Sequence, residues 1–566
     1  MIKRWQYKEI PSHDTIEELS KTINVNAHLT AVLLQRGISD FNEAKDFFRP
    51  SLEKLHDPFL MRDMEQAVQR LKFAIDRVEK ILIYGDYDVD GTTAVSLVYS
   101  YLRKFYPHCE VYVPDRYAEG YGVSQAGVEW AAANNYSLII ALDCGIKAAD
   151  MVTHANNKGI DFIICDHHLP DKNIPNAVAV LDPKREDCQY PYSELSGCGL
   201  GFKLIQAYAQ RYGNEDDVYE FLDLVAVSIA SDIVPITGEN RILAYFGLKK
   251  LNENPMPGLK ALKEIAAIRN DLDISGVVFT LGPRINAAGR VAHASAAVNL
   301  LIAQTEEEAN ALAEKLNLRN DERRQVDSDI TEEAIAMIEG DENLRGSKST
   351  VLFKNSWHKG VIGIVAARCV EKFYKPTVIL TESNNKITGS ARSVSGFDLY
   401  EAIYACSDLL EKFGGHKYAA GLTLDIINLQ AFQKRFEQVV SSTITDDMLT
   451  PVIEIDMPIE FDAITPKFFN VLRQMAPFGP ENLRPVFEAK NVFVYNALNS
   501  FKDRHLRFRV GQQGSHTIFN AVAFDLGEHY DRIAQGDPFH IVFTVEENIF
   551  NGNTSMQLRI KDIKFN

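Results

Sequence analysis

Short apolar runs that each end in a carboxylate or an imidazole side chain recur in the first half of the chain. They cover residues 81–85, 138–142, 162–165 and 225–230, and the acidic residues that follow them are Asp86, Asp143, Asp166 and, after Ser231, Asp232. Runs of this length and composition are typical of strands that are buried on both faces of a parallel sheet. Ligands of an open α/β sheet bind beyond the carboxyl ends of its strands. The four ends are therefore predicted to converge on one metal site.

Helical stretches separate these runs, for example at 92–106 and 148–158. The alternation of strands and helices predicts βαβ units and a parallel sheet, which makes residues 66–300 an α/β domain. Before it, residues 1–65 are predicted to be a helical segment that ends in turns at Pro50 and Pro58.

The second half of the chain is predicted to contain a connecting helix and two further domains. Residues 306–339 lack proline and glycine and are rich in Glu, Ala, Leu and Arg, which predicts a long helix within a connection at 301–345. A second α/β domain is expected at 346–445, beginning with a strand at 350–353. Residues 446–566 carry strand patterns at 452–455, 486–494, 505–510, 521–524, 540–545 and 556–560. Short strands at this spacing suggest a small antiparallel barrel of the oligonucleotide-binding (OB) type.

Composition narrows the class of protein. The chain has 566 residues, 46% of them apolar and 24% charged, which is ordinary for a globular protein of three or four domains. The seven cysteines are odd in number and show no CxxC spacing, so we expect reduced thiols in the cytoplasm. We expect neither a membrane segment nor a signal peptide. The net charge of −17 argues weakly against a nucleic-acid partner, although an acidic metal site contributes part of it.

The segment Gly85-Asp86-Tyr87-Asp88-Val89-Asp90-Gly91 is the most informative part of the chain. In an extended chain, the three aspartates would lie on one side, about 7 Å apart per step. Their mutual repulsion is costly unless a cation neutralises it. Aspartate and histidine ligands without cysteine favour Mn²⁺ or Mg²⁺ over structural zinc, and a pair of such ions suits phosphoester hydrolysis.

Each element of this pattern also has an alternative interpretation. A lone DxDxDG is more often a calcium or turn-like loop, a His-His pair is more often exposed on the surface, and Asp232 alone can cap a helix. The joint occurrence of all of them at strand ends favours the metal site.

These residues resemble a known family. Gly85-Asp86-Tyr87-Asp88-Val89-Asp90-Gly91, Asp143-Cys144-Gly145, Asp166-His167-His168 and Ser231-Asp232 are similar to the four motifs of the DHH phosphoesterase superfamily. Later segments resemble its branch of bacterial single-strand-specific 5′→3′ DNA exonucleases. They are Pro283-Arg284-Ile285-Asn286-Ala287-Ala288-Gly289-Arg290, Gly389-Ser390-Ala391-Arg392-Ser393, Gly414-Gly415-His416-Lys417-Tyr418-Ala419-Ala420-Gly421 and Pro477-Phe478-Gly479-Pro480-Glu481-Asn482. The resemblance extends from about residue 60 to the end of the chain.

The resemblance implies roles for individual residues. Two divalent cations, Mn²⁺ or Mg²⁺, would be held by Asp86, Asp88, Asp90, Asp143, His167 and Asp232, with Asp143 bridging the two ions. Asp166 would orient its neighbour, and His168 would contact the scissile phosphate. Many superfamily members have a histidine ligand where this chain has Tyr84, which leaves the ligand set of each ion open. The domains at 66–300 and 346–445 would be the DHH domain and the DHH-associated domain.

The glycine-rich segments are predicted to bind DNA phosphates. Gly414, Gly415 and the residues after them permit close backbone approach and the start of a helix, although a tight packed turn is the alternative. We expect Ser390, Arg392 and His416 to hold a 5′-terminal phosphate. Arg284, Asn286 and Arg290 are assigned to backbone phosphates near the metals, and structural ion pairs are the alternative for the arginines.

The barrel is predicted to contact single-stranded DNA. Strand alternation sends Arg507 and Arg509 to one face, and Leu506 and Phe508 to the other, so the strand carries a basic face. A charged edge strand exposed to solvent is the alternative.

The resemblance implies a metal-dependent exonuclease that degrades single-stranded DNA to 5′-mononucleotides in repair and recombination. Its partners would be single-stranded DNA, a helicase and a single-strand-binding protein, and the protein would be a monomer. One alternative is a DHH phosphodiesterase or phosphatase acting on short oligonucleotides or small phosphate esters, but those relatives are usually smaller. Another is a replication-fork scaffold that has lost its metal ligands, which this chain retains.

Overall fold

The computed structural model describes residues 2–291, 293–495, 498–502, 504–550 and 553–565. The chain forms two compact units, each assembled from several segments. The large unit comprises Trp5–Ile285, Ala297–Ala313 and Glu454–Asn566, and the small unit comprises Met1–Arg4, Asn286–Ala296 and Glu314–Ile453.

The N-terminal segment is helical, as predicted. Its helices are α1 (His13–Ile23), α2 (Ala27–Gln35) and α3 (Phe41–Phe48), followed by single turns at Leu52–Lys54 and Pro58–Leu60. The side chains of Ser12, Asn26 and Asp40 accept hydrogen bonds from backbone N–H groups at the three helix starts, which explains where the helices begin. The short strand β1 (Arg4–Tyr7), which pairs with β12 (Val452–Ile455), was not predicted.

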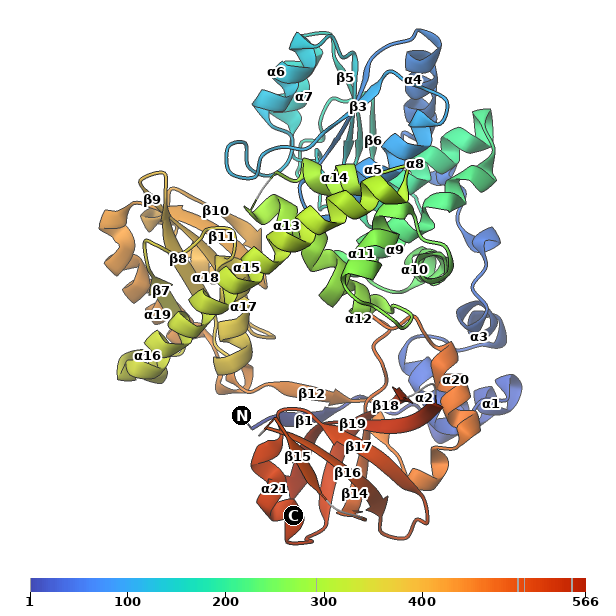
Figure 1. Cartoon of the computed structure of the whole chain (residues 1–566), viewed down its shortest axis with the longest axis vertical. Helices are drawn as coiled ribbons and strands as arrows, with labels where there is room; N and C mark the ends of the chain where they lie inside the picture. Colours follow the sequence, from blue (N-terminus) through green and yellow to red (C-terminus); the bar gives the residue numbers. More distant parts are fainter. Residues whose placement is uncertain (1, 292, 496–497, 503, 551–552, 566) are drawn as a thin grey trace. The chain divides into compact units, whose positions relative to one another are not determined.

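The predicted parallel sheet is present in the large unit (Figure 1). Its strands are β2 (Ile81–Gly85), β3 (Cys109–Tyr112), β4 (Leu138–Leu142), β5 (Asp161–Cys165) and β6 (Ala179–Leu181), in the order β3-β2-β4-β5-β6. Helices α4 (Met64–Asp76), α5 (Val89–Arg103) and α8 (Gly197–Tyr212) contact the sheet, and α6 (Gln125–Ala133) and α7 (Ala149–Asn156) pack into an apolar core with it. All neighbouring strands are parallel, so the carboxyl ends of β2, β4 and β5 lie at one edge.

The prediction of a strand at 225–230 is wrong. This run lies within helix α9 (Leu222–Ser231), every residue of which is buried except the last. A continuous apolar run does not distinguish a fully buried helix from a buried strand, because neither leaves a polar face. Helices α10 (Gly238–Glu253), α11 (Pro257–Ile265), α13 (Gly282–Val291) and α14 (Ser295–Leu301) follow, with a short helical stretch at Ile274–Leu281 before α13.

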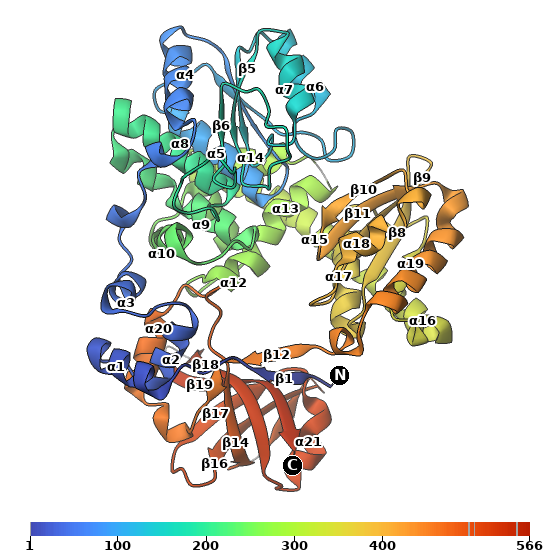
Figure 2. The same cartoon turned by 180° about the vertical axis from the view of Figure 1, so that it is seen from behind.

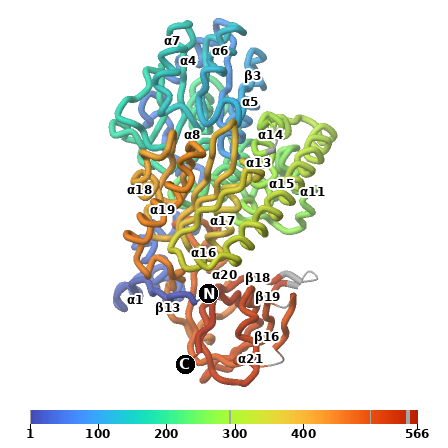
Figure 3. Tube along the Cα trace, turned by 90° about the vertical axis from the view of Figure 1, so that its left-hand side faces the viewer, coloured from blue at the N-terminus to red at the C-terminus, as the bar shows by residue number. Residues whose placement is uncertain are grey.

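The predicted connecting helix is α15 (Glu306–Gly340), which is continuous (Figure 3). The small unit holds a five-stranded mixed sheet in the order β10-β11-β9-β8-β7 (Figure 2). Its strands are β7 (Thr350–Phe353), β8 (Thr377–Ser383), β9 (Lys386–Arg392), β10 (Lys412–His416) and β11 (Ala419–Leu424). Helix α17 (Ile362–Phe373) and the end of α15 share one core with the sheet. Helices α18 (Leu399–Tyr404) and α19 (Leu429–Thr443) share the other.

The C-terminal strands close into a five-stranded barrel. They are β14 (Phe487–Val494), β16 (His505–Gln512), β17 (Ile518–Ala523), β18 (Phe539–Phe550) and β19 (Asn553–Phe565). The order β14-β18-β19-β17-β16 returns to β14 through a β14–β16 pairing. The predicted OB-type barrel is thus confirmed, with two differences. The strand at 452–455 lies outside it as β12, and the β17–β19 pair is parallel.

No helix in the described part of the chain has the length and apolar character needed to span a membrane.

Candidate metal centre

The prediction that the three aspartates of the segment 85–91 alternate along an extended chain is wrong. Asp86 follows β2, but Asp88 is the N-cap of α5, where its Oδ1 accepts a hydrogen bond from Gly91 N at 3.0 Å, and Asp90 lies in the first turn of the helix. The tight turn explains Gly91, because a Cβ atom there would lie 2.5 Å from the carbonyl oxygen of Asp86. The side chain of an N-cap aspartate stabilises the start of a helix, and here the helix replaces the predicted extended chain.

The carboxylate of Asp90 is held by donors from two other helices. It accepts hydrogen bonds from Gly197 N at 2.6 Å, Cys198 N at 2.8 Å and Ser228 Oγ at 2.6 Å. The first two donors are free amides of the first turn of α8, where the helix dipole also favours a negative charge. Sequence reasoning missed Gly197 and Ser228, whose roles depend on tertiary contacts.

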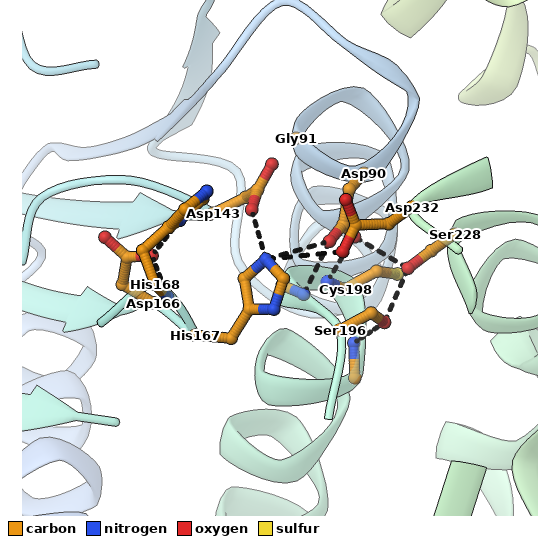
Figure 4. Close-up of polar contacts among 12 residues, drawn as sticks. Asp90, Gly91, Asp143, Asp166, His167, His168, Ser196, Cys198, Ser228 and Asp232 are labelled. Atoms are coloured by element: carbon orange, nitrogen blue, oxygen red, sulfur yellow. Dashed lines mark hydrogen bonds and ion pairs between the residues drawn. The ribbon is translucent and has the colours of Figure 1, made fainter. Parts of the chain in front are cut away.

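The imidazole of His167 is the point where the acidic segments meet (Figure 4). Its Nε2 lies 3.2 Å from Asp143 Oδ1, 3.5 Å from Asp232 Oδ2 and 3.7 Å from Asp90 Oδ2. These three carboxylates come from the end of β4, the end of α9 and the start of α5. Although Asp232 ends a helix and not a strand, the predicted convergence of these residues occurs.

Among the residues that the structure describes, two groups of side chains have the spacing of metal ligands. Asp143, His167 and His168 form one, and Asp90, His167 and Asp232 form the other, with the ligand atoms of each group within 4.8 Å of one another. Asp86 and Asp88 belong to neither group. Both nevertheless lie close enough to the cluster to interact electrostatically, Asp88 with Asp143 and Asp86 with Asp88.

The electrostatics of the cluster fit a bound cation. Burial and then the neighbouring carboxylates raise the pKa values of Asp86 and Asp143 well above the usual range, and raise that of Asp232 to about 8. Burial lowers the pKa of His167, which favours the neutral imidazole that ligates metals. Asp86 Oδ2, Asp143 Oδ1 and His167 Nε2 are buried and have no hydrogen-bond partner among the described residues. Buried polar atoms without partners are costly, and a divalent cation would satisfy Asp143 Oδ1 and His167 Nε2, which belong to one ligand group.

His168 is held in a different way from His167. Its Nδ1 lies 2.7 Å from Asp166 Oδ1, and its Nε2 lies 3.2 Å from the hydroxyl oxygen of Tyr121. Burial lowers the pKa of His168, but the hydrogen bond to Asp166 and the charges of Asp166, Asp232 and Asp90 together outweigh burial, so the net shift is upward. Asp166 itself is fixed by the backbone N–H of Ile146 at 2.9 Å. The arrangement stabilises a charged imidazolium that is partly exposed at the edge of the cluster.

Tyr84 does not supply a metal ligand in place of the superfamily histidine. Its side chain is fully buried in the core beside β2 and stacks on Tyr112 at 5.2 Å. Its hydroxyl donates to Gly122 O at 3.0 Å and accepts from Ser124 N at 3.0 Å. Tyr84 therefore fixes the loop that carries Tyr121.

Sequence reasoning also missed three residues beside the cluster. Asp182 follows β6 and is buried, with a pKa raised to about 7 mainly by burial. Leu169 and Ile233 directly follow His168 and Asp232 in the chain, yet they are 71% and 63% exposed. A strand-end position is the only sequence signal for Asp182, and exposure of apolar side chains has no local sequence signal.

The glycine-rich segment at 414–421 does not begin a helix, contrary to the prediction. It forms the hairpin of β10 and β11, because residues 417–418 make a two-residue connection between strands. Through strand pairing, His416 lies in register with Arg392 of β9, with Ala419 between them. Gly414 likewise lies in register with Ser390, with Gly421 between them. A Cβ atom at Gly414 would meet nothing within 4 Å, so the outer strand presents an open surface.

The side chains of Ser390 and Arg392, which belong to β9, lie beside the start of helix α17. A Cβ atom on Gly363, the second residue of that helix, would lie 2.9 Å from Ser390 Oγ and 3.1 Å from Arg392 Nη2. A hydroxyl and a guanidinium beside the free amides of a helix N-terminus are the groups that bind phosphate.

The remaining predicted DNA-binding residues lie on two elements. Arg284, Asn286 and Arg290 are half-buried on α13, where Arg284 donates to Thr280 O at 2.8 Å and Arg290 donates to Gly360 O at 3.0 Å. On β16, Arg507 and Arg509 are exposed and alternate with buried Leu506 and Phe508, as predicted. The guanidinium groups of Arg507 and Arg509 lie over Phe501 and Tyr495, both at 5.4 Å.

Together, the parallel sheet and the Asp and Asp-His-His residues at its edge define a phosphoesterase of the DHH class. Family models match three parts of the chain: the DHH family N-terminal domain at 80–229, the DHHA1 domain at 346–442 and the RecJ OB domain at 455–562.

Full-length relatives and a solved structure narrow the family. The single-stranded-DNA-specific exonuclease RecJ of Bacillus subtilis is 34% identical over 99% of this chain and 70% of that protein. The protein of the same name from Escherichia coli is 31% identical over 88% of this chain and 90% of that protein. The crystal structure of Thermus thermophilus RecJ with Mn²⁺ superposes with a TM-score of 0.84 at 25% identity, covering 99% of this chain and 79% of that chain. The chain belongs to the RecJ family.

Asp143→Asn tests whether the cluster binds metal. Mn²⁺ is expected to raise the Tm of the unaltered protein, because a ligand that binds only the folded state stabilises it, and to raise that of the variant much less. Without metal, the variant should unfold at an equal or higher temperature, since it lacks one of several buried like charges. Both effects can be measured by differential scanning calorimetry with and without EDTA. An Asp143→Asn protein with the full Mn²⁺-induced rise in Tm would contradict the assignment.

Proposed function

We propose that this chain is a metal-dependent exonuclease that degrades single-stranded DNA from the 5′ end to 5′-mononucleotides. The observation that carries the proposal is the buried cluster around His167, in which Asp86 Oδ2, Asp143 Oδ1 and His167 Nε2 have no hydrogen-bond partner among the described residues and the ligand atoms have a spacing that fits divalent cations. The relatives named single-stranded-DNA-specific exonucleases support it, and so do the crystal structures of Thermus thermophilus RecJ in complex with Mn²⁺ and with Mg²⁺.

The cations are Mn²⁺ or Mg²⁺, and we assign their ligands to Asp86, Asp88, Asp90, Asp143, His167 and Asp232. Bound by these residues, such cations would supply an activated water molecule and charge stabilisation for the scissile phosphate. The protein contributes a rigid ligand set. Asp90 is fixed by the amides of α8, and His167 is kept neutral by burial. Removal of water from this edge of the sheet strengthens every charge interaction within it.

His168 is assigned to the scissile phosphate. Asp166 accepts the hydrogen bond of Nδ1 and stabilises the imidazolium, which leaves Nε2 and the hydroxyl of Tyr121 facing each other at 3.2 Å. A phosphate oxygen entering beside them can accept hydrogen bonds from both groups. In this scheme Asp166 acts through His168, as a positioning residue.

We assign Ser390, Arg392 and His416, with Gly414 and Gly415, to the 5′-terminal phosphate. Capture of that group would set the polarity, because the strand can then enter in one direction only. Arg284, Asn286 and Arg290 of α13 are assigned to backbone phosphates, and Arg507 and Arg509 of β16 to the strand on the barrel, where stacking on aromatic side chains adds about 1–3 kcal/mol per base.

The proposal also covers the biological role, the partners, the oligomeric state, the location and the domains of the protein. A repair and recombination role, a helicase and a single-strand-binding protein as partners, a monomeric state and a cytoplasmic location are parts of the proposal. So is the division into domains at 1–65, 66–300, 301–345, 346–445 and 446–566.

A time course on single-stranded DNA labelled at either the 5′ or the 3′ end tests the proposal. With Mn²⁺ or Mg²⁺, we expect immediate release of labelled mononucleotide from the 5′ label only, and with EDTA none. Asp143→Asn is the matched inactive control, and it should still bind the strand. Intact long DNA together with hydrolysis of dinucleotides or small phosphate esters would instead assign the chain to the small-substrate branch of the superfamily.

Arg392→Ala tests the phosphate site. Loss of a bidentate guanidinium contact should reduce the preference for 5′-phosphorylated over 5′-hydroxyl ends by about 10-fold or more, since a charge-assisted hydrogen bond contributes about 1.5–3 kcal/mol. The readout is the ratio of initial rates on the two substrates. Arg435→Ala is the control, because Arg435 lies on α19 of the same unit and pairs with Asp408. An unchanged ratio in Arg392→Ala would refute the site.

The salt dependence of binding tests the barrel. Replacing both Arg507 and Arg509 with alanine should lower the slope of log K against log salt by about 1.4, because each phosphate contact with a single strand contributes about 0.7. The measurement uses the metal-free protein and a fluorescent oligonucleotide. Arg319→Ala with Arg345→Ala is the control for net charge, since each of these arginines pairs with a neighbouring glutamate. Equal slopes in all three proteins would mean that β16 does not bind phosphates.

A further inference from the structure

The turn at 477–482, between α20 (Pro466–Gln474) and β14, has no role in the function described so far. It contacts the chain segment that follows the metal-ligand candidate Asp232. The backbone N–H of Ile236 donates to Pro480 O at 2.8 Å, and a Cβ atom on Gly479 would lie only 2.5 Å from Ile236 Cγ1. Glycine at position 479 therefore permits close contact with Ile236, which lies four residues after Asp232.

The segment between Asp232 and α10 is strained. Ile233 has a φ of +60°, in the left-handed region that β-branched residues rarely adopt. A non-glycine residue in this region is unfavourable and persists only where its surroundings determine its conformation. The side chain of Ile233 is 63% exposed, so its own packing does not fix the conformation.

Two sets of contacts hold the segment. In the first set, the carbonyl of Pro235 accepts hydrogen bonds from Asn240 Nδ2 of α10 at 3.1 Å and from the hydroxyl of Tyr192 at 3.4 Å. In the second set, the turn supplies the carbonyl of Pro480 and the close backbone of Gly479. The conformation next to Asp232 therefore depends on where the turn lies.

Polar side chains hold the turn at 477–482 in place. Asn482 Nδ2 donates to Met475 O at 3.0 Å and to Pro477 O at 2.7 Å, and its Oδ1 accepts from Arg36 Nη1 of α2. Arg36 Nη2 also donates to Leu483 O at 2.6 Å.

Arg241 joins the same turn to α10. Its guanidinium is 5% exposed, lies over the ring of Phe47 at 3.8 Å and donates to the carbonyls of Phe47, Met475, Ala476 and Pro477. A buried cation satisfied by carbonyls alone requires all of them in place, because each N–H group left unpaired is costly. Arg241 therefore holds the approach to the barrel and the helix after Asp232 in one arrangement.

We propose that the turn at 477–482 is a positioning element for the metal ligand Asp232, with Gly479 and Arg241 as positioning residues. The inference rests on the assignment of Asp232 as a ligand in the proposed function. The turn contacts the segment after Asp232, so the position of the turn is expected to affect metal affinity at the edge of the parallel sheet. Because the turn also leads directly into the barrel, it links the barrel to the metal site. Groups that orient ligands typically change metal affinity by 10–100-fold when they are altered.

Gly479→Ala is the main test. The added methyl displaces Ile236, and we expect the dissociation constant for Mn²⁺, measured on the metal-free protein by titration calorimetry and by electron paramagnetic resonance of free Mn²⁺, to rise about 10-fold. The affinity of the metal-free protein for an oligonucleotide and its Tm should change little. Gly340→Ala is the matched control, because a Cβ atom at Gly340 would meet nothing within 4 Å.

Two further variants keep the test decisive. Gly479→Ala with Ile236→Ala removes the clash and should recover most of the Mn²⁺ affinity, which a general loss of stability would not do. Arg36→Met loosens the turn without adding an atom near Asp232 and should weaken Mn²⁺ binding about 3-fold, the effect of one modest hydrogen bond. This variant serves if Gly479→Ala does not fold.

The outcomes separate the inference from the proposed function. If Asp232→Asn leaves Mn²⁺ affinity unchanged, the ligand assignment itself is wrong. If Asp232→Asn weakens Mn²⁺ binding while Gly479→Ala and Arg36→Met do not, the positioning role is refuted and the proposed function stands. If the turn variants weaken DNA binding and leave Mn²⁺ affinity intact, the turn serves the barrel alone, and the inference is likewise overturned.

Discussion

Repulsion among buried carboxylates is the constraint on which the rest of the structure depends. Asp86, Asp143 and Asp232 are brought to one edge of a parallel sheet, where burial and mutual repulsion raise their pKa values. Within the described chain, protein donors satisfy Asp90 but leave Asp143 Oδ1 and His167 Nε2 without partners. A protein retains such an arrangement only when something else balances the charge, and divalent cations do so while creating a centre for phosphodiester hydrolysis.

The surrounding elements hold this charged cluster in place. The first turn of α8 supports Asp90, the backbone at Ile146 supports Asp166, and Tyr84 supports the loop of Tyr121. The contact between Ile236 and the turn at 477–482 extends this support to the approach to the barrel. The segment that follows Asp232 and the turn before the barrel are thus joined by a specific hydrogen bond, and not only by covalent continuity of the chain.

Much of this could be predicted from the sequence, because the strands at 81–85, 138–142 and 161–165 are apolar and end in acids. The run at 225–230 was assigned to a strand because a fully buried helix has the same apolar pattern. The glycines at 414–421 indicated close approach but not that it occurs in a hairpin. Tyr121, Asp182, Ser228 and the left-handed Ile233 acquire their roles through tertiary contacts, which no local pattern encodes.

The central claim is that the cluster around His167 binds two divalent cations. Anomalous diffraction at the manganese absorption edge, from crystals soaked in Mn²⁺, tests it most directly because it locates each ion without reference to activity. The account predicts two peaks, both bounded by carboxylate oxygens of the cluster, with Asp143 in contact with each ion and His167 Nε2 in contact with one. Peaks only at exposed surface acids, or none beside Asp143 and His167 at saturating Mn²⁺, would contradict it.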